Sequence, residues 1–69
     1  MSNAIRTRLL EEIAKHMSLA ADAAELGIDH ERVEQLKLVR RACIELDRMD
    51  GKSSDENQVI AWVDRHLKA

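Results

Sequence analysis

The sequence predicts an all-α fold, in which a long helical hairpin and a short third helix form a dimeric helical bundle. Proline does not occur among the 69 residues, glycine occurs twice, and apolar residues recur at helical spacing. No stretch alternates β-branched and polar residues for more than a few positions, so strands are not expected. We expect a single domain over residues 1–69, with helices at about 3–26, 30–50 and 54–67.

The first expected helix begins after Ser2 or Asn3, because either side chain is a good N-cap. At about 100° per residue, one of its faces is apolar and is expected to meet the core; it carries Ile5, Leu9, Ile13, Met17, Ala20 and Ala24. Gly27 follows Leu26 and is expected to close this helix. Asp29 is expected to act as the N-cap of the next helix.

The second expected helix is apolar over so much of its circumference that we interpret it as the central element of the fold and of a dimer. Its seam recurs at alternating three- and four-residue steps and consists of Leu36, Val39, Cys43 and Leu46. We expect Cys43 to be a small buried hydrophobe, which would approach its mate if this helix pairs with its own copy. Gly51 can take the left-handed conformation that ends the helix.

The third expected helix begins with Ser53 and Glu56, which match the spacing of a capping box. Its buried stripe consists of Val59, Ile60, Val63 and Leu67. Trp62 stands at the edge of this stripe, and either covers the end of the core or is half exposed and anchors a partner. In the second case Arg65 and His66 belong to the same patch.

The composition narrows the classes of function. The chain has no Phe or Tyr and a single Trp, so its core must come from smaller side chains, and we expect a homodimer to supply the missing burial. With 11 basic and 13 acidic side chains the net charge is -2, which does not imply general attraction to nucleic acid or membranes. No apolar run approaches the roughly 18 residues that span a bilayer. One cysteine forms no internal disulfide, so a cytoplasmic protein is expected.

Motifs for metal binding and catalysis are not found in the sequence. The soft metal ligands are His16, His30, His66 and Cys43, and no two of them share a short ligand motif. Neither a glycine-rich phosphate loop nor a nucleophile motif occurs. We therefore expect no metal, no cofactor and no enzymatic activity.

The corner from Ala23 to Leu36 resembles a degenerate helix-turn-helix. Ala23, Gly27 and Val33 stand where that motif has its small residue, its turn glycine and an apolar residue of the second helix. Asp22 departs from the usual apolar residue, and acidic side chains at the tip would repel phosphates. The side chains that would contact DNA are His30, Arg32 and Gln35. The other interpretation of this corner is a structural αα-hairpin.

A row of cations follows one side of the second expected helix and consists of Lys37, Arg41 and Arg48, with Arg40 adjacent. Such a row can contact phosphates or an acidic protein surface. Glu34 and Glu45 lie in the same stripe, so a solvated face of paired charges is the other interpretation.

The stretch from Cys43 to Leu67 resembles part of the small bacterial two-component connector family that is linked to biofilm and acid-resistance regulation. The likeness consists of an amphipathic helix, a glycine turn at Gly51, and the paired apolar residues Val59 and Ile60 followed by Val63 and Leu67. It covers about a third of the chain, which differs from the family in its long N-terminal helix. The resemblance implies a dimeric helical regulator without enzymatic activity.

Our main hypothesis from the sequence is a small, acidic, dimeric adaptor or anti-activator of bacterial or phage type. It would bind another protein, such as a transcriptional regulator, and inhibit it. The expected binding patch combines the third helix with the polar edge of the second and consists of Trp62, Arg65, His66, Lys37, Arg41 and Arg48. A helix-turn-helix repressor is the alternative, and a structural subunit of a larger assembly is a third hypothesis.

Overall fold

The computed structural model describes residues 3–68 and contains three α-helices and one short 3-10 helix: α1 (Asn3–Leu26), α2 (Asp29–Met49), η1 (Ser54–Glu56) and α3 (Gln58–Lys68). No strand occurs in this part of the chain, so the predicted all-α fold with two long helices and a short third one is confirmed. Ser2, one of the two expected N-caps, lies outside the described residues. Asn3 is the first residue of α1.

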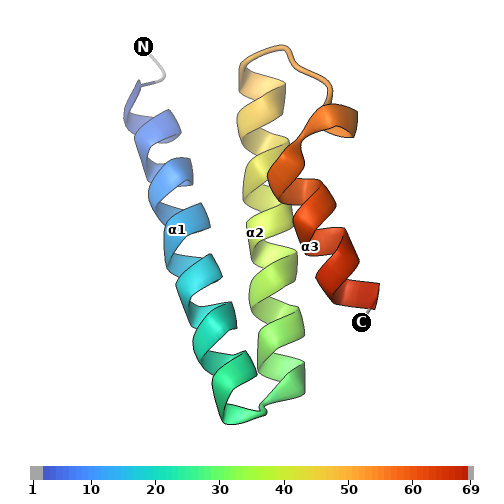
Figure 1. The fold of residues 1–69 in the computed structure, drawn as a ribbon. Coiled ribbons are helices and arrows are strands. Elements are labelled where there is room, and N and C mark those ends of the chain that lie inside the picture. The colour runs from blue at the N-terminus through green and yellow to red at the C-terminus, as the bar shows by residue number, and fades with distance from the viewer. Residues whose placement is uncertain (1–2, 69) are drawn as a thin grey trace.

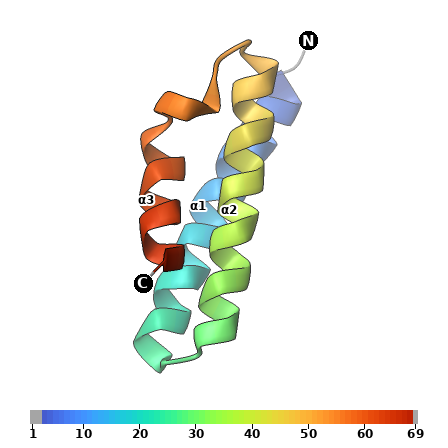
Figure 2. The ribbon, with the colours of Figure 1, turned by 90° about the vertical axis from the view of Figure 1, so that its right-hand side faces the viewer.

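α2 is the central helix. α1 and α2 run antiparallel, side by side, and α3 runs back along α2 from the second turn (Figure 1). After a turn of 90°, α3 lies to the left of α2 and α1 lies behind α2 (Figure 2). Both outer helices pack mainly against α2, and together they form an elongated body of 40 × 23 × 13 Å. α1 and α3 make little direct contact with each other.

The first turn ends α1 as its glycine predicts. Gly27 has a φ of +72°, and the backbone amide of Ile28 donates to the carbonyl of Ala23 at 2.9 Å. The start of α2 differs from the expectation, because Asp29 is already helical and Ile28 is the flanking residue, with no side-chain cap. The Asp29 carboxylate accepts instead from the guanidinium of Arg32, at 2.8 Å from Nη2. The predicted capping role of Asp29 is therefore wrong.

The second turn is longer than the sequence predicts. Gly51 has a φ of +66° and ends α2, but the next turn is the 3-10 helix η1 and not the start of α3. The hydroxyl of Ser53 accepts from the amide of Asp55 at 3.2 Å and caps this short helix. The cap of α3 is Asn57, whose Oδ1 accepts from the amides of Val59 and Ile60 at 2.9 and 3.1 Å. α3 therefore begins at Gln58, later than expected.

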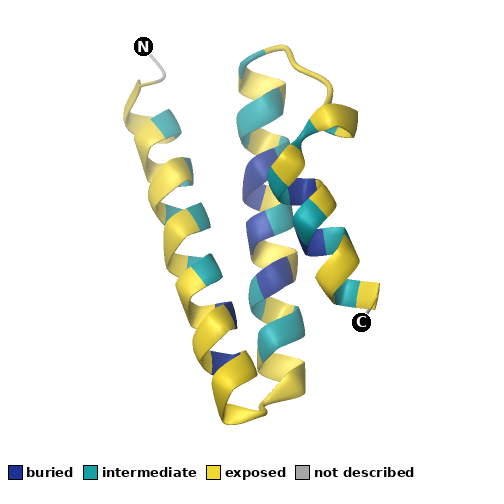
Figure 3. Ribbon diagram, viewed as in Figure 1, coloured by how far each residue is buried: buried dark blue, intermediate teal, exposed yellow. Residues whose placement is uncertain are grey.

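The core is narrow and follows α2 (Figure 3). The buried apolar residues among 3–68 are Ala20, Ala23, Leu36, Val39, Ala42, Cys43, Ile60 and Val63. Ile13, Met17, Ile44, Val59, Trp62 and Leu67 pack around them and remain partly exposed. Two members of the expected α1 face lie outside the core, since Ile5 is 59% exposed and Ala24 is exposed while Ala23 is buried.

Candidate protein-binding surfaces

The expected seam of α2 is buried inside one chain. Leu36, Val39 and Cys43 are 2%, 0% and 3% exposed, and Leu46 is partly buried. Cys43 is a free thiol, and burial, followed by the nearby Asp47 carboxylate, raises its pKa. Because α1 and α3 of the same chain cover this seam, a second copy has to bind elsewhere, and the expected approach of Cys43 to its mate is not supported by this packing.

Trp62 lies at the boundary between core and surface. It is partly buried against the core, and together with Met17, Gln58 and Val59 it lines an open groove of about 190 Å³. Met17 comes from α1 and the other three from α3, so this α1–α3 groove joins two helices that barely touch otherwise. Leu10, two helical turns before Met17 on the same face of α1, is 50% exposed and extends the apolar surface.

His66 is fixed beside Trp62. Their ring centroids are 4.3 Å apart at an interplanar angle of 39°, and Nδ1 of His66 donates to the carbonyl of Trp62 at 2.8 Å. A carbonyl only accepts, so Nδ1 carries a proton in this arrangement. Arg65 is exposed next to this pair. The structure thus brings Trp62 and His66 into contact, and the patch that would add Arg65 stays a prediction.

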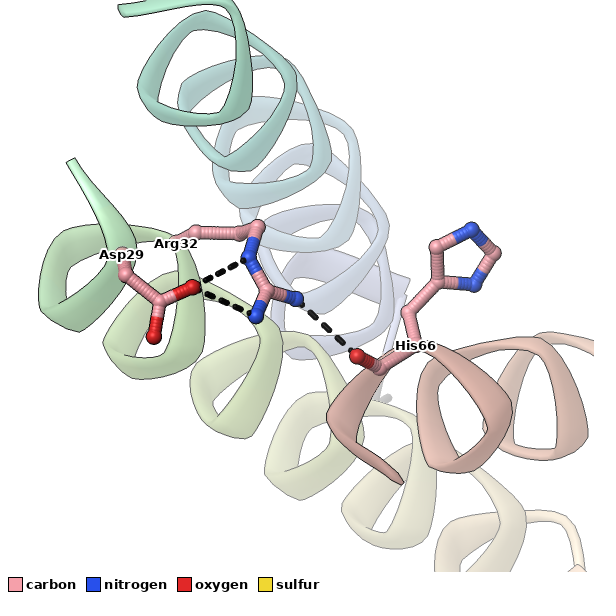
Figure 4. Close-up of polar contacts among 3 residues, drawn as sticks. All are labelled: Asp29, Arg32 and His66. Carbon is pink, nitrogen blue, oxygen red and sulfur yellow. Dashed lines mark hydrogen bonds and ion pairs between the residues drawn. The ribbon is translucent and has the colours of Figure 1, made fainter. Parts of the chain in front are cut away.

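Arg32 ties the start of α2 to the end of α3 (Figure 4). Its Nη1 donates to the backbone carbonyl of His66 at 3.0 Å, while Nε and Nη2 donate to Oδ1 of Asp29 at 3.3 and 2.8 Å. The Arg32 side chain is 20% exposed. This residue, expected as a DNA contact, therefore has a structural role that the sequence pattern did not indicate.

The other two expected DNA contacts, His30 and Gln35, lie in different surroundings. His30 is exposed at the corner, whereas Oε1 of Gln35 accepts from Nδ1 of His16 at 2.6 Å and joins α2 to α1. The helices of a helix-turn-helix cross at about 90–120°, but α1 and α2 lie side by side (Figure 1). The corner has the geometry of an αα-hairpin, and DNA binding stays a prediction.

The cations of α2 line a separate groove. Its open volume is about 380 Å³, and its lining residues are Lys37, Arg40, Arg41, Ile44, Glu45 and Arg48. None of these residues lines the groove at Trp62. The single patch expected from the sequence therefore consists of two surfaces, the α1–α3 groove and this outer groove of α2. The sequence could not show this division, because it depends on which side of α2 is covered by α3.

Residues 3–68 contain no group of three or more His, Cys, Asp or Glu side chains that could hold a metal ion. None of the helices in the described part of the chain is both long enough and apolar enough to span a membrane.

Comparisons with known proteins give no family for this chain: no family model, curated protein or solved structure matches it. The resemblance of Cys43–Leu67 to the connector family stays a prediction. Any functional proposal therefore rests on the two grooves and on the packing of the helices.

Proposed function

We propose that this protein is a small non-enzymatic regulator that acts as a homodimer, and that it binds and inhibits another protein such as a transcriptional regulator. The observation that carries this proposal is the α1–α3 groove. Its lining joins a partly exposed tryptophan to Met17 and Val59, and the exposed Leu10 lies beyond it on α1. Tryptophan in such a setting is typical of the energetic centre of a protein interface.

The thin core supports self-association. Half of the buried set is alanine or cysteine, and the larger members are Leu36, Val39, Ile60 and Val63. Large apolar side chains stay exposed along α1, in the first turn and along α2: Ile5, Leu10, Leu19, Leu26, Ile28, Leu38 and Met49. Burial of apolar surface is worth about 25 cal/mol per Å². A second copy that covers part of this surface would add stability where a single small domain has little.

The mechanism that follows is occlusion. An apolar side chain of the partner enters the groove and packs on Trp62 and Met17, while the exposed Arg65 forms the polar rim. His66 holds the Trp62 edge of the groove in place through its ring contact and its bond to Arg32. A partner surface bound in this way is no longer free for its own DNA or its own dimer, which is how a small helical protein inhibits without catalysis.

The test combines capture and oligomeric state. Tagged protein is used to purify binding proteins from lysate with and without nuclease, and mass spectrometry identifies them. Replacing Trp62 and Arg65 with Ala should abolish capture of the same protein, whereas Arg8→Ala on the exposed side of α1 should leave it intact. The helical circular-dichroism signal should persist in both variants. Capture that is unchanged by the Trp62 and Arg65 replacements, or lost with nuclease, would contradict the site.

Sedimentation velocity tests the homodimer. We expect a species of twice the chain mass that dissociates on dilution. A single species at the mass of one chain at all concentrations would rule out the homodimer and leave the binding proposal to the capture experiment.

A further inference from the structure

The outer groove of α2 presents positive charge on a chain whose net charge is -2. Lys37, Arg41, Ile44 and Arg48 follow one another at steps of four, three and four residues, which places them in one stripe along about three turns of helix. A stripe of this length is long enough for a second helix to pack along it.

Part of this positive charge is not neutralised by the protein itself. Arg40 is bonded to Asp64 at 2.9 Å and Arg48 to Glu45 at 3.2 Å. Within residues 3–68, neither Lys37 nor Arg41 has an ion pair, although both line the groove. Two cations four residues apart on a helix repel each other. A carboxylate bound between them would remove this repulsion.

The groove is not only charged. Ile44 lies between Arg41 and Arg48 in the stripe and is partly exposed. The methylene stems of the flanking arginines extend an apolar surface while their guanidinium groups stay in water. An apolar side chain flanked by acidic ones is therefore the best complement to this surface.

We propose that the outer groove of α2 binds an acidic amphipathic helix of the regulated protein. Carboxylates of that helix pair with Lys37 and Arg41, and one apolar side chain packs on Ile44, as in other cases where a helix lies in a groove. This rests on the proposed function, since it names the chemistry of the protein partner. Nucleic acid is the weaker complement, because phosphates gain nothing from the apolar Ile44 side chain.

The experiment measures fluorescence anisotropy of a labelled synthetic helix on the full-length protein. The probe is an alanine-based peptide with Glu, Glu, Leu and Glu at the spacing of Lys37, Arg41, Ile44 and Arg48. A peptide of the same composition in scrambled order and a duplex DNA of random sequence serve as comparison probes. Arg41→Glu reverses one charge in the groove, and Lys15→Glu makes the same charge change on an exposed part of α1.

We expect the ordered peptide to bind at least about tenfold more tightly than the scrambled one, since only the ordered peptide presents its leucine with the carboxylates. Arg41→Glu should weaken this binding about tenfold or more, and Lys15→Glu should change it less than about twofold. Ile44→Ser should weaken the binding of the ordered peptide and leave the binding of the scrambled peptide unchanged. Circular dichroism confirms that each variant is folded.

Equal binding of both peptides, equal loss in Arg41→Glu and Lys15→Glu, or tighter binding of DNA than of the ordered peptide would each overturn the inference. So would the lack of any binding by the unmodified protein. None of these outcomes affects capture through Trp62 or the oligomeric state, so failure of this inference is distinguishable from failure of the proposed function.

Discussion

The side-chain amide of Asn57 links the cap of α3 to Asp47 in the middle helix. Its Nδ2 donates to Oδ2 of Asp47 at 2.9 Å, while its Oδ1 accepts from the amides of Val59 and Ile60. The same Asp47 oxygen accepts from the hydroxyl of Ser54 at 3.0 Å. One carboxylate of α2 therefore orders both the 3-10 turn and the start of α3.

Replacing Asn57 with Ala should lower the free energy of unfolding by about 1–2 kcal/mol, because the cap of α3 and the bond to Asp47 are both lost. Urea unfolding followed by circular dichroism measures the change. Asn57→Asp keeps an acceptor for the cap but places a second carboxylate against Asp47, so it should also destabilise the fold. Adding Asp47→Asn should restore part of that loss. An Asn57→Ala variant as stable as the unmodified protein would mean that the cap does not hold α3.

The contact between Asn57 and Asp47 also shows which parts of the fold can be predicted from the sequence and which cannot. Local signals were sufficient for the all-α class and for the ends of α1 and α2, because Gly27 and Gly51 terminate helices through their own backbone conformation. The start of α3 was misplaced because Ser53 offers an equally good local signal. What selects Asn57 is its contact with Asp47, ten residues away in sequence and on another helix.

The candidate sites show the same limit. Helical periodicity predicted that Trp62 and His66 lie near each other on α3, but it could not show that Met17 of α1 completes the groove. It also could not show that the outer face of α2 lies in a different groove from Trp62. Both facts depend on the packing of helices, which a single sequence pattern does not encode. The bond from Arg32 to the distant carbonyl of His66 was not predicted for the same reason.

Val39 should be the most sensitive point of the core, because its side chain is 0% exposed and it lies on the helix that contacts both others. Val39→Ala should lower the free energy of unfolding by about 1–3 kcal/mol through lost burial and a residual cavity. Leu26→Ala removes a larger side chain, but Leu26 is 73% exposed, so its effect should stay within about 0.5 kcal/mol. Chemical denaturation of both variants measures the difference. A larger loss for Leu26→Ala than for Val39→Ala would contradict this ranking of the two sites by burial.

Cys43 should make the stability of the protein sensitive to alkaline pH. Burial raises the pKa of its thiol in the folded state, so above about pH 8.5 the unfolded chain releases the proton while the folded chain retains it. Stability from this group is present below the unfolded pKa and is lost as the pH rises through the folded pKa. The Cys43→Ala variant should lack this part of the alkaline decline, although it is less stable at neutral pH. Unfolding curves between neutral pH and about pH 10 measure it, and parallel decline in both proteins would refute the role of the thiol.

The contact between Arg6 and Asp50 should give the opposite dependence at acid pH. Arg6 of α1 donates to the carboxylate of Asp50 just after α2, and this hydrogen bond is the main reason that the pKa of Asp50 is lowered. A carboxyl with a lowered folded pKa contributes stability above its unfolded value near 3.9, and this contribution is lost as the pH falls through the folded pKa. Arg6→Ala should therefore be less stable than the unmodified protein at neutral pH, and the difference should shrink on acidification. Arg8→Ala removes an equal charge from the 81% exposed Arg8 side chain and should give a difference that is small at all pH values. Urea unfolding between pH 7 and about pH 2 provides the comparison. If the Arg6→Ala difference stayed constant over this range, the contact would not hold the N-terminal turns of α1 against the end of α2 through charge.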